Sequence, residues 1–134
     1  MLIKAILFDI GNTLGTVHLD SKTLAPFDDM LDLLKTAGRV FRVPLGVITN
    51  IPDDWNKTDV ENLLRGAGIL DHLDVRGIIT SVDAKGSKPE KRIYEYAAQQ
   101  LDVKTSECLF IDDELRNVLG ASAAGMSAIQ KVAP

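Results

Sequence analysis

The chain has 134 residues, of which 46% are hydrophobic and 25% are charged, and its formal net charge is −4. This length predicts one domain over residues 1–134, and a mildly acidic chain without a Lys/Arg cluster is a poor partner for nucleic acid. No apolar run approaches the roughly 18 residues of a membrane-spanning helix and no secretory leader is recognisable, so we expect a cytoplasmic protein with no membrane partner.

Apolar runs typical of strands alternate along the chain with segments of helical periodicity. Strands are expected over residues 3–8, 45–49, 76–80, 108–112 and 127–130, and helices over residues 24–37, 58–67, 89–101 and 115–124. This alternation indicates a parallel sheet, because right-handed crossovers give successive strands the same direction. The expected fold is a single three-layer α/β/α, Rossmann-like domain with a five-stranded parallel sheet.

The predicted helix ends rest on capping signals. Thr58 and Glu61 have the spacing of a capping box, and Pro89 suits a first helical position. Gly38 and Gly68 each follow the last turn of a predicted helix, where a glycine commonly ends the helix.

Polar residues follow three predicted strands at the point where each strand ends. Asp9 comes directly after the apolar run Ile6–Phe8, Thr49 ends the second strand, and Asp112 and Asp113 end the fourth. The carboxyl ends of parallel strands share one edge of the sheet, and ligands bind at that edge. Each residue also has an ordinary explanation, as a turn residue, the end of a β-branched strand, or an acid at a helix N-terminus.

Four stretches resemble, in order, the four motifs of the haloacid dehalogenase (HAD) superfamily. They are FDIGNTL (8–14), VITN (47–50), SKPEKRIYEYA (87–97) and FIDDELRNVLGASAAGM (110–126). Each string alone is weak evidence, but four in order, at predicted strand ends and helix starts, are strong evidence. The resemblance implies a HAD-like fold and a Mg²⁺-dependent phosphohydrolase that acts on a phosphorylated substrate through an aspartyl-phosphate intermediate.

The resemblance also implies a role for each matching residue. Asp9 matches the nucleophile, and Lys88 matches the lysine that neutralises both the phosphate and the ionised nucleophile. Thr49 matches the residue whose hydroxyl binds phosphate oxygens, together with backbone N–H groups such as that of Asn50. Lys85 is a nearby alternative to Lys88, but no proline follows it.

For the metal, the resemblance implies few protein ligands, since Mg²⁺ retains several waters. Asp9 and Asp113 match its carboxylate ligands, and the backbone carbonyl of Gly11 matches a third ligand. Asp112, also assigned to the metal site, and Asn117 are expected close by.

The first motif departs from the pattern of most HAD phosphatases, which carry a second Asp two residues after the nucleophile. Gly11 occupies that position here, and it is followed by Asn12, the other residue expected to line the substrate site. A proton-transferring side chain typically contributes 10² to 10⁴-fold to the rate, so low activity is expected unless another group, such as His18, supplies it. Similar first motifs occur in a branch that resembles sugar-1-phosphate phosphatases.

Two alternatives to a phosphatase remain. One is a catalytically weak binding or regulatory module that keeps a phosphate and metal pocket. The other is a haloacid dehalogenase-type hydrolase, which also lacks the second Asp. The acids in FIDDE disfavour that alternative, because the dehalogenase branch generally replaces them by small polar residues.

The predicted elements leave no room for a large cap domain. One helix nearly fills the interval from Leu14 to Leu45, and one helix and one strand occupy the interval from Asn50 to Lys88. An open site suits a large substrate or a site covered by a second copy of the chain in a homo-oligomer. Trp55 could stack on a substrate, meet such a copy, or pack inside the domain.

Two further features are interpreted as structural. Cys108 is the only cysteine and opens an apolar strand, which is typical of a buried, inert thiol. The small residues of GASAAG (120–125) fall at the end of a predicted helix and suggest close packing on the sheet rather than a nucleotide-binding loop.

Overall fold

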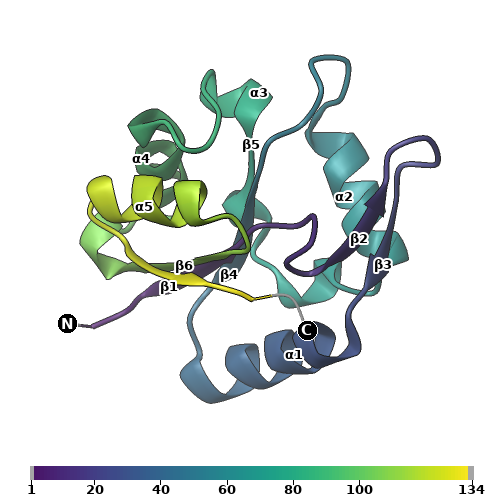
Figure 1. Ribbon diagram of the computed structural model, residues 1–134. Helices are drawn as coiled ribbons and strands as arrows, with labels where there is room; N and C mark the ends of the chain where they lie inside the picture. Colours follow the sequence, from purple (N-terminus) through teal and green to yellow (C-terminus); the bar gives the residue numbers. More distant parts are fainter. Residues whose placement is uncertain (1, 133–134) are drawn as a thin grey trace.

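A computed structural model, which describes residues 2–132, contains a five-stranded sheet in the order β5-β4-β1-β6-β7 (Figure 1). All four strand pairs in it are parallel, as predicted. The strands are β1 (Ala5–Phe8), β4 (Leu45–Thr49), β5 (Ile78–Thr80), β6 (Cys108–Asp112) and β7 (Ser127–Gln130).

The sheet is covered by helices on both faces, which gives the predicted three layers. In Figure 1, α5 lies above the sheet and α1 below it. Two hydrophobic cores result: α1 and α2 pack against one face, and α4 and α5 pack against the other. The helices are α1 (Asp28–Phe41), α2 (Lys57–Gly66), α3 (Ser81–Ala84), α4 (Lys91–Gln100) and α5 (Leu115–Ala123), and short 3₁₀ helices span Leu70–His72, Val75–Gly77 and Thr105–Glu107.

The strand β1 is apolar throughout because each of its residues faces one of the two cores. Ile6 and Phe8 contact the core beneath α1 and α2, whereas Ala5 and Leu7 contact the core beneath α4 and α5. A continuous apolar run of this kind is the pattern expected of a buried parallel strand.

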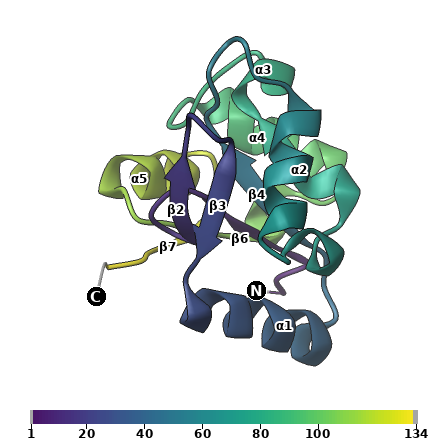
Figure 2. The same ribbon diagram turned by 90° about the vertical axis from the view of Figure 1, so that its right-hand side faces the viewer.

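The predicted helix over 24–37 is wrong at both ends. Residues 15–26 form an antiparallel hairpin of β2 (Gly15–His18) and β3 (Thr23–Pro26), seen beside α2 in Figure 2. The hairpin depends on a close approach, because a Cβ atom at Gly15 would lie 2.2 Å from the carbonyl oxygen of Ala25. The helix α1 then starts at Asp28 and runs through Gly38 to Phe41.

The predicted capping signals also need correction. The capping box of α2 is formed by Asn56 and Asp59, not by Thr58 and Glu61. The Asp59 N–H donates to the Asn56 side chain and the Asn56 N–H donates to the Asp59 side chain, both at 3.0 Å. Both pairs have the right spacing, and the extended backbone of Asn56 (φ −135°, ψ 178°) sets the earlier one as the start.

Of three other predicted helix boundaries, those at Pro89 and Gly38 are wrong and the one at Gly68 is confirmed. Pro89 precedes α4, whose first helical residue is Lys91. Gly38 lies inside α1, and the left-handed residue that ends this helix is Arg42 (φ 53°). Gly68 follows α2 with φ +76°, as predicted.

The first and third strands are shorter than predicted. β1 begins at Ala5, and β5 begins at Ile78 because residues 75–77 form a 3₁₀ turn. Among residues 2–132, no helix is both long enough and apolar enough to cross a membrane.

Candidate active site

Polar side chains from separate segments meet at the carboxyl edge of the sheet. Phe8 pairs with Val47 and with Ile111, so the residues that follow on all three strands reach the same edge. Asp9 comes directly after β1, Thr49 ends β4, and Asp112 ends β6. The convergence predicted from chain order is therefore present.

Lys88 lies at the centre of this group. Its Nζ is 2.5 Å from Asp9 Oδ1 and 3.1 Å from Asp112 Oδ2. Lys88 is only 4% exposed and Asp112 is fully buried. The ammonium and the carboxylates therefore compensate one another's charge, since little water reaches them. Lys85, the alternative lysine, is the exposed residue that ends α3.

Asn50 holds the backbone of Lys88 in place. Its Oδ1 accepts from the Lys88 N–H at 2.8 Å, and its Nδ2 donates to the Lys88 carbonyl at 3.2 Å. These two bonds fasten the loop before α4 to the end of β4. The Asn50 side chain is thereby engaged, and Asn50 also lines the cavity described below.

Thr13 links the two carboxylates on either side of it, although sequence reasoning assigned it no role. Its hydroxyl lies 3.1 Å from Asp9 Oδ2 and 3.2 Å from Asp113 Oδ1, and it accepts from the Asp113 N–H at 3.1 Å. Because the hydroxyl has one proton, it can donate to only one carboxylate at a time. In the sequence, only the place of Thr13 inside FDIGNTL, four residues after Asp9, could have indicated that it belongs to the site.

Asp9, Asp112 and Asp113 form an acidic group, with one oxygen of each within 4.8 Å of the others. Asp112 already accepts three hydrogen bonds, from Lys88, from the Glu114 N–H at 2.9 Å and from Asn117 Nδ2 at 3.1 Å. Asp9 and Asp113 keep more of their acceptor capacity. All-oxygen donors of this kind are those that Mg²⁺ prefers.

Asn117 adds a second observation that agrees with a hydrated cation. Within the part of the chain that the structure describes, its Oδ1 is a buried oxygen with no hydrogen-bond partner. A buried polar atom without a partner is rare and calls for a water or an ion nearby. The residues present thus suit a hydrated divalent cation.

The environment of Asp9 perturbs its ionisation. The pKa of Asp9 is raised from 3.8 to about 7. Burial is the main cause and the charge of Asp112 adds to it, and together they outweigh the attraction of Lys88. Burial therefore disfavours the ionised form of Asp9 in the metal-free protein.

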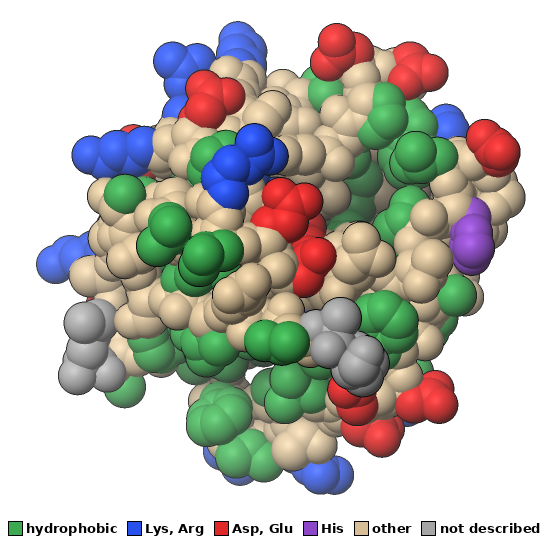
Figure 3. Space-filling model, in the orientation of Figure 1, with side chains coloured by type: hydrophobic (Ala, Val, Ile, Leu, Met, Phe, Trp, Pro, Cys, Tyr) green, Lys and Arg blue, Asp and Glu red, His purple; other side chains and the backbone are tan. Residues whose placement is uncertain are grey.

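A cavity of about 500 Å³ opens directly on these residues. Figure 3 shows a hollow with acidic side chains on one side and hydrophobic side chains on the other. Gly11, Asn12 and Thr49 line it, as do Glu114 and Arg116, two residues that sequence reasoning assigned no role. Asn12 adopts a left-handed backbone (φ 62°) at the turn after β1.

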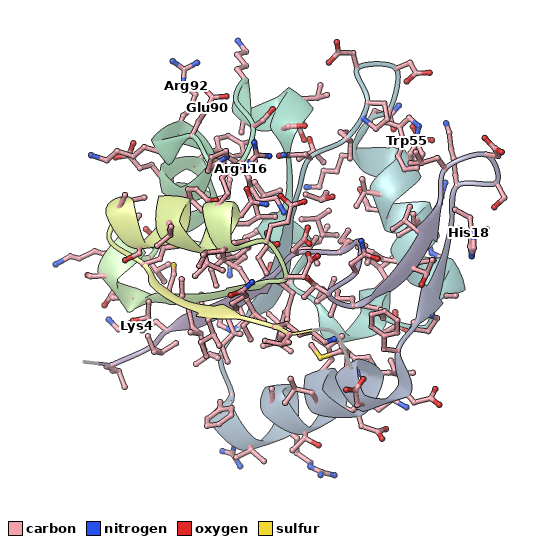
Figure 4. All side chains as sticks on the ribbon, viewed as in Figure 1. Lys4, His18, Trp55, Glu90, Arg92 and Arg116 are labelled. Carbon is pink, nitrogen blue, oxygen red and sulfur yellow. The ribbon has the colours of Figure 1, made fainter. Side chains whose placement is uncertain are left out.

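Trp55 and His18 are placed differently with respect to this cavity. Trp55 is 7% exposed and lines the cavity as part of the core beneath α2, so it packs inside the domain. His18 is exposed on the hairpin and does not line the cavity, and Figure 4 shows it at the outer margin of the molecule. The neighbouring Val17, on the opposite face of the strand, is the residue that lines it.

The two features interpreted as structural are Cys108 and the small residues of the segment 120–125. Cys108 is buried, and burial raises the pKa of its thiol to about 11. The segment 120–125 forms the end of α5 and the turn after it. Ala121 and Ala124 are buried in the core against the sheet, as predicted. Gly120 instead packs against Pro89, since a Cβ atom there would lie 2.6 Å from the Pro89 Cβ.

The chain is similar to proteins of one family. Residues 6–131 match the model of haloacid dehalogenase-like hydrolases. Validoxylamine A 7′-phosphate phosphatase of Streptomyces hygroscopicus subsp. limoneus is 32% identical over 82% of this chain and 48% of its own length. (S)-2-haloacid dehalogenase 1 of Pseudomonas sp. (strain CBS-3) is 29% identical over 63% of this chain and 37% of its own length.

A solved structure gives the same result. The HAD phosphatase of Thermococcus onnurineus superposes with a TM-score of 0.67 and 29% identity, covering 78% of this chain and 46% of its own. The chain thus spans about half the length, or less, of these relatives.

Proposed function

This chain belongs to the haloacid dehalogenase-like hydrolase family, and from that membership we propose that it hydrolyses phosphate monoesters with Asp9 as the nucleophile. The observation that carries the proposal is the contact of Lys88 with both Asp9 and Asp112 at the floor of an open cavity. A phosphatase among the relatives supports it.

The proposed reaction has two steps. A carboxylate oxygen of Asp9 attacks phosphorus, the bond from phosphorus to the ester oxygen breaks, and an aspartyl phosphate forms. The ester oxygen leaves as an alkoxide and takes a proton from water. Water then attacks the phosphorus of this intermediate, which releases inorganic phosphate and restores the Asp9 carboxylate. Lys88 offsets negative charge on the nucleophile and on the phosphoryl oxygens. Thr49 offers a hydroxyl whose only hydrogen bond within residues 2–132 is a long one, 3.5 Å to the Asn50 carbonyl.

In this proposal the cation is held by Asp9, Asp113 and the backbone carbonyl of Gly11. Asp112 and Asn117 support the site from behind, because Asp112 already accepts three hydrogen bonds. When bound, Mg²⁺ would neutralise charge and hold the phosphoryl group against the nucleophile.

Mg²⁺ should raise the melting temperature of the wild-type protein, since a ligand bound only by the folded state stabilises it. At 100 times its dissociation constant the gain is about 2.7 kcal/mol. Asp113→Ala should abolish this shift, whereas Asp32→Ala, at an exposed position on α1, should keep it. Differential scanning fluorimetry with and without Mg²⁺ measures both, and an equal shift in Asp113→Ala would rule out Asp113 as a ligand.

Gly11 can accept a side chain. Its φ lies outside the left-handed region, and a Cβ atom there would make an ordinary contact, 3.8 Å from Val17 Cγ2. Gly11→Asp should therefore fold and supply the missing proton-transferring group. Turnover of alkyl phosphates should rise about 10-fold or more, and aryl phosphates should gain less because their leaving groups need little protonation.

The control for this prediction is Gly11→Ala, which adds the Cβ atom without the carboxyl group. Steady-state kinetics on methyl phosphate and p-nitrophenyl phosphate, with Mg²⁺, compare the two variants. If Gly11→Ala folds and Gly11→Asp leaves methyl phosphate turnover unchanged, the proposed defect at Gly11 is wrong.

A haloacid dehalogenase is the second candidate, because one relative carries that name and the second Asp is absent here. A panel of phosphate esters with Mg²⁺, run beside 2-chloropropionate without metal, separates the two. Phosphate release that depends on Asp9 supports the phosphatase, and halide release supports the dehalogenase. If neither phosphate nor halide is released, a binding module is favoured.

A further inference from the structure

The cavity next to Asp9 has two chemically different sides. The polar side holds Asp9, Thr49 and Lys88, where the phosphoryl group would bind under the proposed function. The opposite side is formed by apolar side chains of the hairpin, the loop after β4 and α2, namely Val17, Leu19, Ile51, Pro52, Trp55 and Leu63. We name these six residues the apolar wall. Figure 4 shows Trp55 across the site from Arg116.

Charged side chains are nearly absent from the space in front of the apolar wall. Of the described residues that line the cavity, Lys88 and Arg116 are the only cations. Lys88 already contacts two carboxylates, and the Arg116 side chain is 72% exposed on α5, 3.7 Å from Glu114. A second phosphate or a carboxylate near the apolar wall would meet the Lys22 ammonium, which is already paired with Asp59.

The hairpin part of the apolar wall is held in position by Lys22. Its Nζ lies 3.2 Å from Asp59 on α2 and 5.2 Å from the centre of the Trp55 ring. These contacts join the end of the hairpin to α2 and to the loop before it, which carry the rest of the wall. The wall is therefore formed before a ligand arrives, which lowers the entropic cost of binding.

The size of the cavity leaves space beyond a phosphoryl group. About 500 Å³ lies within the range of sites for small organic ligands, roughly 300–1,000 Å³. An uncharged hydroxyl-rich group placed against the apolar wall would lose its hydration without gaining partners, whereas an apolar group would gain by leaving water.

We propose that the substrate is a phosphate monoester whose organic part is apolar and contacts the apolar wall. This inference rests on the proposed phosphatase function, and it makes Val17, Leu19 and Trp55 residues that determine specificity. A sugar phosphate or a bisphosphate is a poor substrate in this view.

Binding of unreactive phosphonates tests the proposal independently of turnover. Benzylphosphonate and 2,3-dihydroxypropylphosphonate carry the same charged group and differ in the polarity of the organic part. By isothermal titration calorimetry with Mg²⁺, benzylphosphonate should bind about 10-fold more tightly or better. Equal affinities, tighter binding of the dihydroxypropyl compound, or no binding of either at millimolar concentration would overturn the proposal.

Two variants locate the effect on the wall. Leu19→Ser, at an exposed hairpin position, and Val17→Thr, which keeps the side-chain volume, should each weaken benzylphosphonate several-fold and leave the dihydroxypropyl compound nearly unchanged. Leu33→Ser, at an exposed position on α1 outside the cavity, is the matched control and should change neither affinity. An unchanged preference in both wall variants would place the apolar group elsewhere and contradict the inference.

Turnover of benzyl phosphate and glycerol phosphate separates this inference from the function on which it rests. If neither ester, nor p-nitrophenyl phosphate, is hydrolysed, the phosphatase proposal fails, and the phosphonate affinities still decide the apolar preference. If both esters are hydrolysed with equal kcat/KM, the phosphatase stands and the apolar preference is wrong.

Discussion

Asp9→Asn should lower kcat for phosphate ester hydrolysis at least about 1,000-fold, because the amide has nearly the same shape as the carboxylate but cannot attack phosphorus. Asp9 directly follows β1 and contacts both Lys88 and Thr13. Single-turnover assays on p-nitrophenyl phosphate give the rate, and activity within 10-fold of wild type would exclude Asp9 as the nucleophile.

The same variant has a second expected property that does not depend on turnover. The pKa of Asp9 is raised from 3.8 to about 7 in the metal-free folded protein. Between these values the folded state binds more protons than the unfolded state, so the contribution of Asp9 to stability is lost as pH rises through about 7. Asp9→Asn removes this dependence.

Urea denaturation in EDTA at pH 5 and pH 8 measures the difference. Relative to wild type, Asp9→Asn should be more stable at pH 8 than at pH 5. The free energy of unfolding of the variant minus that of wild type should therefore be larger at pH 8. Asp53→Asn, at an exposed position in the loop after β4, should follow the wild-type pH dependence. Parallel pH profiles for wild type and Asp9→Asn would mean that burial does not disfavour the Asp9 carboxylate.

Much of the site could be predicted from the order of strands and polar residues. Asp9, Thr49 and Asp112 meet because parallel strands share an edge, which follows from chain connectivity alone. The position of the Lys88 ammonium could not be predicted in this way, because it depends on the two hydrogen bonds to Asn50 and on the burial of Asp112. Only the family resemblance selected Lys88 over Lys85 in advance.

The hairpin could not be predicted in the same way. Leu24, Phe27, Leu31 and Leu34 are spaced three and four residues apart, which is the pattern of a helix face. The hairpin depends instead on the contact of Gly15 with Ala25, which the local pattern does not show. This error matters for function, because the same hairpin supplies Val17 and Leu19 to the cavity.

Lys88→Met should have the largest effect on stability of any substitution at the site. It leaves the buried Asp9 and Asp112 without their cation, and removing one partner of a buried ion pair typically costs 3–5 kcal/mol. Lys85→Met, three residues earlier at an exposed position, should change the free energy of unfolding by less than about 0.5 kcal/mol. Turnover should fall together with stability in Lys88→Met alone.

A double-mutant cycle shows whether this cost comes from the uncompensated carboxylates. In Asp9→Asn/Lys88→Met one of the two acids is neutral, so the double variant should be more stable than Lys88→Met in urea denaturation at pH 8. The recovery should be smaller at pH 5, where Asp9 of the metal-free protein is already mostly protonated. If the two substitutions simply added at pH 8, the contact between Lys88 and Asp9 would carry no coupling energy, and the cost would come from lost packing and from Asp112.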